Sequence, residues 1–187
     1  MVAMIDLAMP VLVSTLLVFF ASFVLHAVLN WHWRDQDPLP DEEAVTGPIR
    51  TAGVPPGNYR FPFAPSEKEM RSPEMQKKFE AGPVGFLTLY PSGVPKMGKS
   101  LTQWFFYIVV VGVFVAYLAS RSVAPGAAYL DVFQIVGTVA FLAYAGSEPI
   151  ASIFYARKWS ATLKNVVDGL IYGLLTAGSF AWLWPAV

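Results

Sequence analysis

Residues 131–184 decide the fold of this protein. They read DVFQIVGTVAFLAYAGSEPIASIFYARKWSATLKNVVDGLIYGLLTAGSFAWLW. Two apolar runs, 132–155 with 24 residues and 166–184 with 19, flank a short basic turn at 156–159. About 20 helical residues, each rising about 1.5 Å, cross the roughly 30 Å of hydrocarbon in a bilayer. The stretch therefore predicts a transmembrane hairpin.

The second run of this hairpin carries small residues at every fourth position, namely Gly169, Gly173, Ala177 and Ala181. This spacing stacks them on one face of a helix, where another backbone can approach closely. We expect this face to be a helix-packing surface. The simpler explanation is that small residues are frequent in membrane helices.

Composition also indicates an integral membrane protein. Hydrophobic residues make up 55% of the chain and charged residues 14%, with a mean hydropathy of +0.49. These values lie outside the usual range of a soluble domain. The absence of cysteine excludes disulfides, thiolate metal sites and cysteine nucleophiles. A formal net charge of zero argues against nucleic acid as a partner.

Two further apolar runs complete an all-α membrane fold with four transmembrane helices. The run at 8–29 follows a leader without Lys or Arg, so we expect a retained helix rather than a cleaved signal. The predicted organisation is transmembrane helix 1 in 1–30, a cytoplasmic Pro-rich loop in 31–100, and a three-helix transmembrane domain in 101–187, with spans at 101–120, 132–155 and 166–184.

The loop 31–100 differs sharply from the spans, because most of the 15 prolines and most of the charges lie there. Short helices are predicted to open at Asp41 and at Ser72, the second with Pro73 in its first turn and Gly82 as its stop. Proline clusters between them favour extended or polyproline conformation, and 84–90 predicts a strand. No core large enough to fold alone is visible.

Orientation follows from the distribution of Lys and Arg, which are enriched in cytoplasmic loops. The loop 31–100 and the turn 156–165 together hold 12 of the 13 basic residues, and only Arg121 lies on the other side. This places both termini outside and both basic loops in the cytoplasm. The six tryptophans fall at predicted helix ends, as an aromatic belt requires.

Three ionisable residues lie inside the predicted spans and form a candidate polar intramembrane cluster: His26, Glu148 and Asp168. Such a group costs about 2.5 to 3.5 kcal/mol on insertion scales, so it is a functional hypothesis by default. All three fall in the cytoplasmic half of the bilayer. Pro149 should also break or kink the helix beside Glu148, because it has no N–H to donate.

Structural explanations of the same residues stay open. Arg157 and Lys164 are potential ion-pair partners of Glu148. In an ion pair Glu148 would be charged, whereas the functional hypothesis has it as a neutral acid that shares a proton. Asp168 would serve as a cap of the fourth helix, and His26 as a hydrogen-bonding group between helices.

Neither a cofactor nor a metal site is predicted. His26 and His32 are six residues apart, on different faces of a helix, which argues against haem ligation. Two histidines would need several carboxylates to form a metal site, and no HExxH, GxSxG or Walker pattern is present. The sequence favours a non-enzymatic protein.

Two stretches carry a resemblance to a known group of proteins. One is SPEMQKKFE at 72–80, followed by GPVGFL at 82–87, and the other is the tail from Trp159 to Pro185. Over nearly the whole chain, the sequence resembles an uncharacterised bacterial family of four-helix inner-membrane proteins. The resemblance implies a bacterial inner (cytoplasmic) membrane and no particular activity, substrate or cofactor.

Two classes of function are consistent with these patterns. The first is a structural or accessory subunit that lies in the lipid bilayer and docks on a membrane protein partner or on another copy of itself. The second is a small oligomeric transporter, channel or membrane enzyme that uses the Glu/Asp/His cluster. We expect the first, because four spans leave little room for a translocation path.

The basic-residue count predicts opposite labelling of two engineered cysteines in a chain that has none of its own. In intact cells, a membrane-impermeant thiol reagent should label Ser122→Cys and leave Ser92→Cys unlabelled. The reverse pattern would invert the orientation and move the polar cluster to the outer leaflet.

Overall fold

The computed structural model describes residues 1–186 and divides the chain into two compact units. One unit consists of Met1–Asp37 and the chain from Lys96 onward, and the other of Pro38–Pro95. The chain is mostly helical, as predicted, but a two-stranded sheet lies in the second unit, so the all-α prediction is wrong there.

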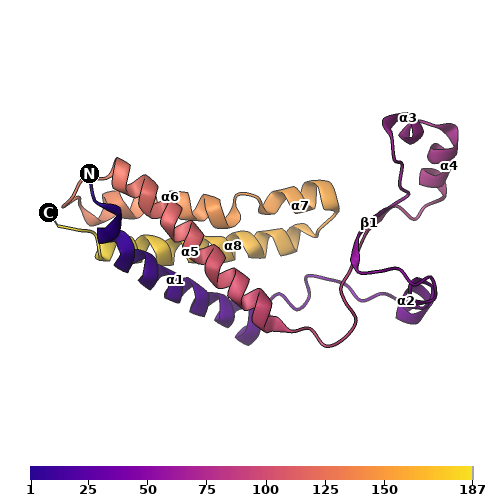
Figure 1. Cartoon of the computed structure of the whole chain (residues 1–187), viewed down its shortest axis with the longest axis horizontal. Coiled ribbons are helices and arrows are strands. Elements are labelled where there is room, and N and C mark those ends of the chain that lie inside the picture. Colours follow the sequence, from indigo (N-terminus) through magenta and orange to yellow (C-terminus); the bar gives the residue numbers. More distant parts are fainter. Residues whose placement is uncertain (187) are drawn as a thin grey trace. The chain divides into compact units, whose positions relative to one another are not determined.

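The first unit is a bundle of helices that lie side by side (Figure 1). In chain order, the elements are the 3-10 turn η1 (Met4–Leu7), α1 (Ala8–Phe23), the π-helical turn η2 (Val24–Val28), α5 (Met97–Ser122), α6 (Tyr129–Ala145), α7 (Glu148–Tyr155) and α8 (Trp159–Trp182). α8 contacts α1, α6 and α7, whereas α5 contacts α1 and α6. α8 is therefore the central helix of the bundle.

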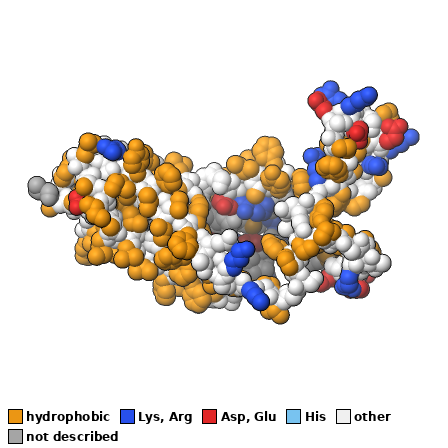
Figure 2. Space-filling model, in the orientation of Figure 1, with side chains coloured by type: hydrophobic (Ala, Val, Ile, Leu, Met, Phe, Trp, Pro, Cys, Tyr) orange, Lys and Arg blue, Asp and Glu red, His pale blue; other side chains and the backbone are white. Residues whose placement is uncertain are grey.

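Three helical segments are long and apolar enough to cross a membrane, judged by length and composition: Met4–Val28, Met97–Ser122 and Tyr129–Tyr155. Only 28% of the apolar window in each is buried within the protein. The bundle consequently presents a largely hydrophobic surface (Figure 2). A surface of this kind needs an apolar environment such as a bilayer.

α8 covers the predicted span 166–184 except for its last two residues, because the helix ends at Trp182. It is not among these three segments. It has 24 residues, which is long enough, but Lys164, Asn165 and Asp168 make its first half more polar. α8 can accommodate these polar residues because it packs between neighbouring helices, where polar side chains need not face lipid.

The predicted single helix 132–155 is two helices. α6 ends at Ala145, and α7 begins at Glu148 with Pro149 in its first turn. The break falls where proline removes a backbone donor and crowds the preceding turn. This discontinuity separates the polar end of the hairpin from its apolar part.

The small residues of α8 face α6. A Cβ atom built at Gly169 would lie 2.7 Å from Cβ of Ala145, and one at Gly173 would lie 3.1 Å from the backbone nitrogen of Phe141. Ala177 meets α6 at Gly137, where an added Cβ would be 3.2 Å away. The two backbones thus approach closely, and Ala181 lies buried in the same core.

The second unit contains α2 (Glu42–Thr51), β1 (Gly57–Phe61), α3 (Glu67–Met70), α4 (Pro73–Ala81) and β2 (Gly85–Leu89). Asp41 and Ser72 cap α2 and α4 as predicted, accepting hydrogen bonds from the first-turn backbone. The strands pair antiparallel, with Gly57 opposite Leu89. Met75 is the one buried residue of 38–95, which agrees with the absence of a large core.

The contact between α6 and α8 predicts that Gly173→Leu destabilises the bundle, because the added side chain meets backbone atoms of α6. Overpacking of this kind costs about 1–3 kcal/mol or more. Thermal unfolding in mild detergent measures the loss. Gly178→Leu is the matched control, since a Cβ atom added at Gly178 would lie 3.8 Å from its nearest neighbour, the Tyr129 hydroxyl. Equal losses in the two variants would contradict the packing assignment.

Candidate functional site

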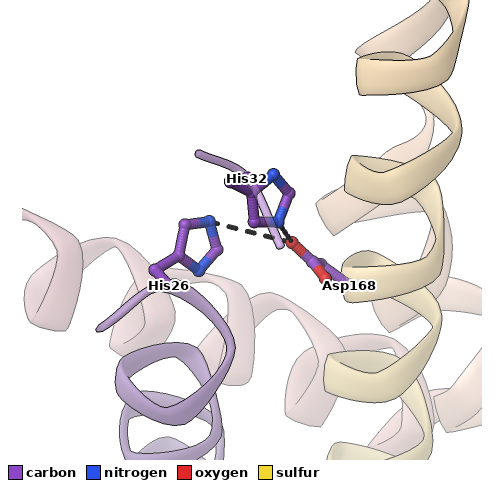
Figure 3. A group of neighbouring side chains, drawn as sticks. All are labelled: His26, His32 and Asp168. Carbon is purple, nitrogen blue, oxygen red and sulfur yellow. Dashed lines mark hydrogen bonds and ion pairs between the residues drawn. The ribbon is translucent and has the colours of Figure 1, made fainter. Parts of the chain in front are cut away.

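Asp168 is the centre of a polar cluster in the helical bundle. It lies in the third turn of α8, and its side chain is 4% exposed. Its Oδ2 atom is 2.7 Å from Nε2 of His32 and 3.7 Å from Nε2 of His26 (Figure 3). Because α8 begins at Trp159, the interpretation of Asp168 as a helix cap is wrong.

The two histidines come from the end of the first helical segment and the turn after it. His26 lies in η2, and Asn30, with a left-handed φ of 52°, follows the end of the helix. The imidazole rings of His26 and His32 stack, with centroids 4.4 Å apart and planes at 8°. The expectation that they occupy different faces of one helix is wrong, because the helix ends between them.

Asp35 and Lys164 surround this cluster with a second set of contacts. Oδ2 of Asp35 is 2.6 Å from Nδ1 of His32, and Oδ1 accepts a hydrogen bond from Nζ of Lys164 at 2.5 Å. Lys164 also donates to the backbone carbonyl of Trp31 at 2.6 Å. These bonds tie residues 31–35 to α8.

Opposing effects act on the carboxyl of Asp35. Burial raises its pKa, but the hydrogen bonds and charges of Lys164 and His32 lower it by more, so the net pKa lies below the ordinary value. A carboxyl with a lowered pKa stabilises the fold above its unfolded pKa, and this stabilisation is lost as pH falls through the folded one.

His32 stands between two carboxylates, and this constrains its protonation. A neutral imidazole carries one N–H, so it can donate to Asp35 or to Asp168 but not to both. Filling both contacts requires an imidazolium ion, a protonated carboxyl group that donates to one nitrogen, or another cation beside one nitrogen. Oδ1 of Asp168 is buried and, within residues 1–186, has no hydrogen-bond partner. The site therefore has unused capacity to bind a positive group.

Glu148 belongs to a different network. Its Oε2 atom accepts hydrogen bonds from Arg157 at 2.6 Å and from Asn165 at 2.8 Å. Arg157 also donates to the backbone carbonyl of Glu148 at 2.6 Å. The structure thus brings together two members of the predicted cluster, His26 and Asp168. Glu148 instead forms an ion pair with Arg157, which was the alternative explanation of this residue.

Sequence reasoning missed His32, Asp35 and Lys164 as members of the site. His32 and Asp35 lie just beyond the first apolar run, in the segment WHWRDQD at 31–37. Polar residues concentrated directly after a span were the available signal. Their contacts with α8 span more than 100 positions along the chain and have no local signature.

His26, His32 and Asp168 form a group that could hold a metal ion. Each offers one ligand atom, and these atoms lie within 4.8 Å of one another. Imidazole nitrogen and carboxylate oxygen are ligands that borderline divalent ions such as Zn²⁺ accept. The sequence-based prediction of no metal site had treated the histidines as separated.

No family model, no curated protein and no solved structure matches the chain.

The Glu148 network predicts matching losses of stability in two variants. Glu148→Gln and Arg157→Gln should each lower the free energy of unfolding by about 1–3 kcal/mol, less than for a fully buried pair because the side chains are 24% and 29% exposed. Thermal unfolding in detergent measures this.

The control is Lys158→Gln, whose partner Asp37 is 76% exposed. It should change stability by less than about 0.5 kcal/mol. Unaltered stability of Glu148→Gln would instead support a neutral, proton-sharing acid at that position.

Proposed function

We propose that this protein is a multi-pass protein of the bacterial inner membrane and a structural or accessory subunit of a membrane assembly. The three apolar segments support membrane association, and α8 serves as the fourth span, buried among the others. The basic-residue distribution supports termini on the outer side and the unit Pro38–Pro95 in the cytoplasm.

An open groove between α6 and α8 carries this proposal. Its volume is about 290 Å³, with Gly137 and Gly173 among its lining residues beside aromatic and aliphatic side chains. A lining of this kind admits a large side chain from another helix. The occupant we assign to the groove is a membrane-spanning helix of a partner subunit or of a second copy.

Polar groups in the groove support a protein occupant over lipid. Gln134 and Thr138 are exposed and line it. Hydrocarbon offers no hydrogen-bond partners to an amide or hydroxyl, whereas a neighbouring helix does. Thr138 already donates to the carbonyl of Gln134, so the Gln134 amide is the group with most to gain.

A second function is favoured by a separate observation. The buried Asp168 contacts two histidines through Oδ2, and its Oδ1 has no hydrogen-bond partner among the described residues. This supports a small oligomeric transporter, channel or membrane enzyme that handles a proton or a cation. In this alternative, His32 takes the place that the sequence-based prediction gave to Glu148.

Photo-crosslinking in the native membrane tests the accessory role. A photoreactive residue at Thr138 should give a stoichiometric product with a membrane protein or with a second copy. The matched control is Phe114 of α5, which is 64% exposed and not part of the groove. The proposal predicts no protein product there. Products with lipid alone at both positions would contradict it.

A further inference from the structure

We propose that His26, His32 and Asp168 form a binding site for a divalent transition-metal ion of the zinc class, with the two Nε2 atoms and the Asp168 carboxylate as ligands. The three side chains come from η2, from the turn after it and from α8, and they converge on one point (Figure 3). The site is argued independently of the accessory role, because none of its three residues lines the groove.

The outer nitrogens of both histidines have acceptors of their own. Nδ1 of His26 is 3.1 Å from the backbone carbonyl of Ser22, and Nδ1 of His32 is 2.6 Å from Asp35. An Nδ1–H that donates to a carbonyl or a carboxylate fixes the tautomer and leaves a lone pair on Nε2. Metal-binding histidines are commonly held in this way. Both lone pairs are then available on the side of Asp168.

The charged form of the Asp168 carboxylate needs a positive partner because the side chain is buried. The Asp168 side chain is 4% exposed, and its Oδ1 atom has no hydrogen-bond partner in the described part of the chain. A buried carboxylate is costly unless it is paired or coordinates a metal. A metal ion bound through Oδ1 or Oδ2 supplies that pairing without a proton on His32.

Metal binding requires a small rearrangement that the site permits. Tetrahedral ligands about 2.0–2.2 Å from Zn²⁺ are separated by about 3.3 Å, so the 2.7 Å contact between His32 and Asp168 must open. The stacked rings must also tilt, because their lone pairs lie in two nearly parallel planes that do not meet at one ion. His26 is 53% exposed and lies at a helix end, so its ring has room to turn. Its exposed side leaves a position for water or another ligand.

The donor set selects the class of ion. Two imidazoles and one carboxylate suit Zn²⁺ or Fe²⁺, whereas Mg²⁺ and Ca²⁺ prefer all-oxygen sites. Thiolate ligation is excluded because the chain has no cysteine. These two histidines are also the only ones in the chain, so any imidazole-dependent binding reports on this site.

Zinc titration of the full chain in lipid nanodiscs, purified through a tag without histidine, tests the proposal. The native chain should bind one equivalent of Zn²⁺, and a large excess of Mg²⁺ should not displace it. His26→Gln should weaken binding at least tenfold, and the exposure of this residue makes loss of the fold improbable. His32→Gln and Asp168→Asn should abolish stoichiometric binding. Circular dichroism and gel filtration verify that each variant is folded.

Asp37→Asn is the matched control. It removes an exposed carboxylate from the same segment, outside the ligand set, and should leave zinc affinity unchanged. Cobalt substitution gives an independent readout, since a tetrahedral site should produce visible absorption that His26→Gln removes. Failure of the native chain to bind zinc, or binding that is unaffected by His26→Gln, would overturn the proposal.

Discussion

The close approach of α6 and α8 determines where the other parts of the helical unit lie. Glycine at 169 and 173 leaves no side chain between the two backbones, so the helices meet at a distance that any larger residue would prevent. Asp168 directly precedes the first of these glycines. The same contact that joins the hairpin therefore fixes the depth and direction of the buried carboxylate.

The polar groups of the helical unit that are buried or partly buried form two networks. One joins Glu148 to Arg157 and Asn165, and the other joins Asp168 to residues of the segment that follows α1. Each ion brings a partner of opposite charge or a hydrogen-bonding group, which offsets much of the cost of its burial. The two networks meet in sequence at Lys164 and Asn165, which are adjacent residues of α8.

Local signals in the sequence predicted much of this fold. Apolar runs located the helices that are long and apolar enough to cross a membrane, and Asp41 and Ser72 located two helix starts. Length, hydropathy and capping depend on neighbouring residues only. The start of α8 at Trp159 was missed, since the polar residues of its first two turns interrupt the apolar run.

The pairing of β1 with β2 and the position of His32 depend on contacts between distant parts of the chain. Nothing near Gly57 or Leu89 specifies their register. Likewise, the segment 31–37 contains no pattern that points to α8. The candidate site was therefore predicted in part. Asp168 and His26 were identified because ionisable groups are costly inside a membrane. His32 joins them only through the tertiary structure.

The π-helical turn η2 affects how the cluster responds to a change in the length of the chain. Leu29 donates to the carbonyl of Val24 at 2.9 Å, five residues back, so this turn is wider than an α-helical one by a single residue. Because the wider turn takes up the additional residue, deleting one residue there would restore a regular helix and leave the direction of the chain beyond it nearly unchanged. Deleting one residue within α1 itself would instead rotate His32 and Asp35 by about 100° relative to the start of α1. The cluster should therefore tolerate a one-residue deletion in η2 better than the same deletion in α1.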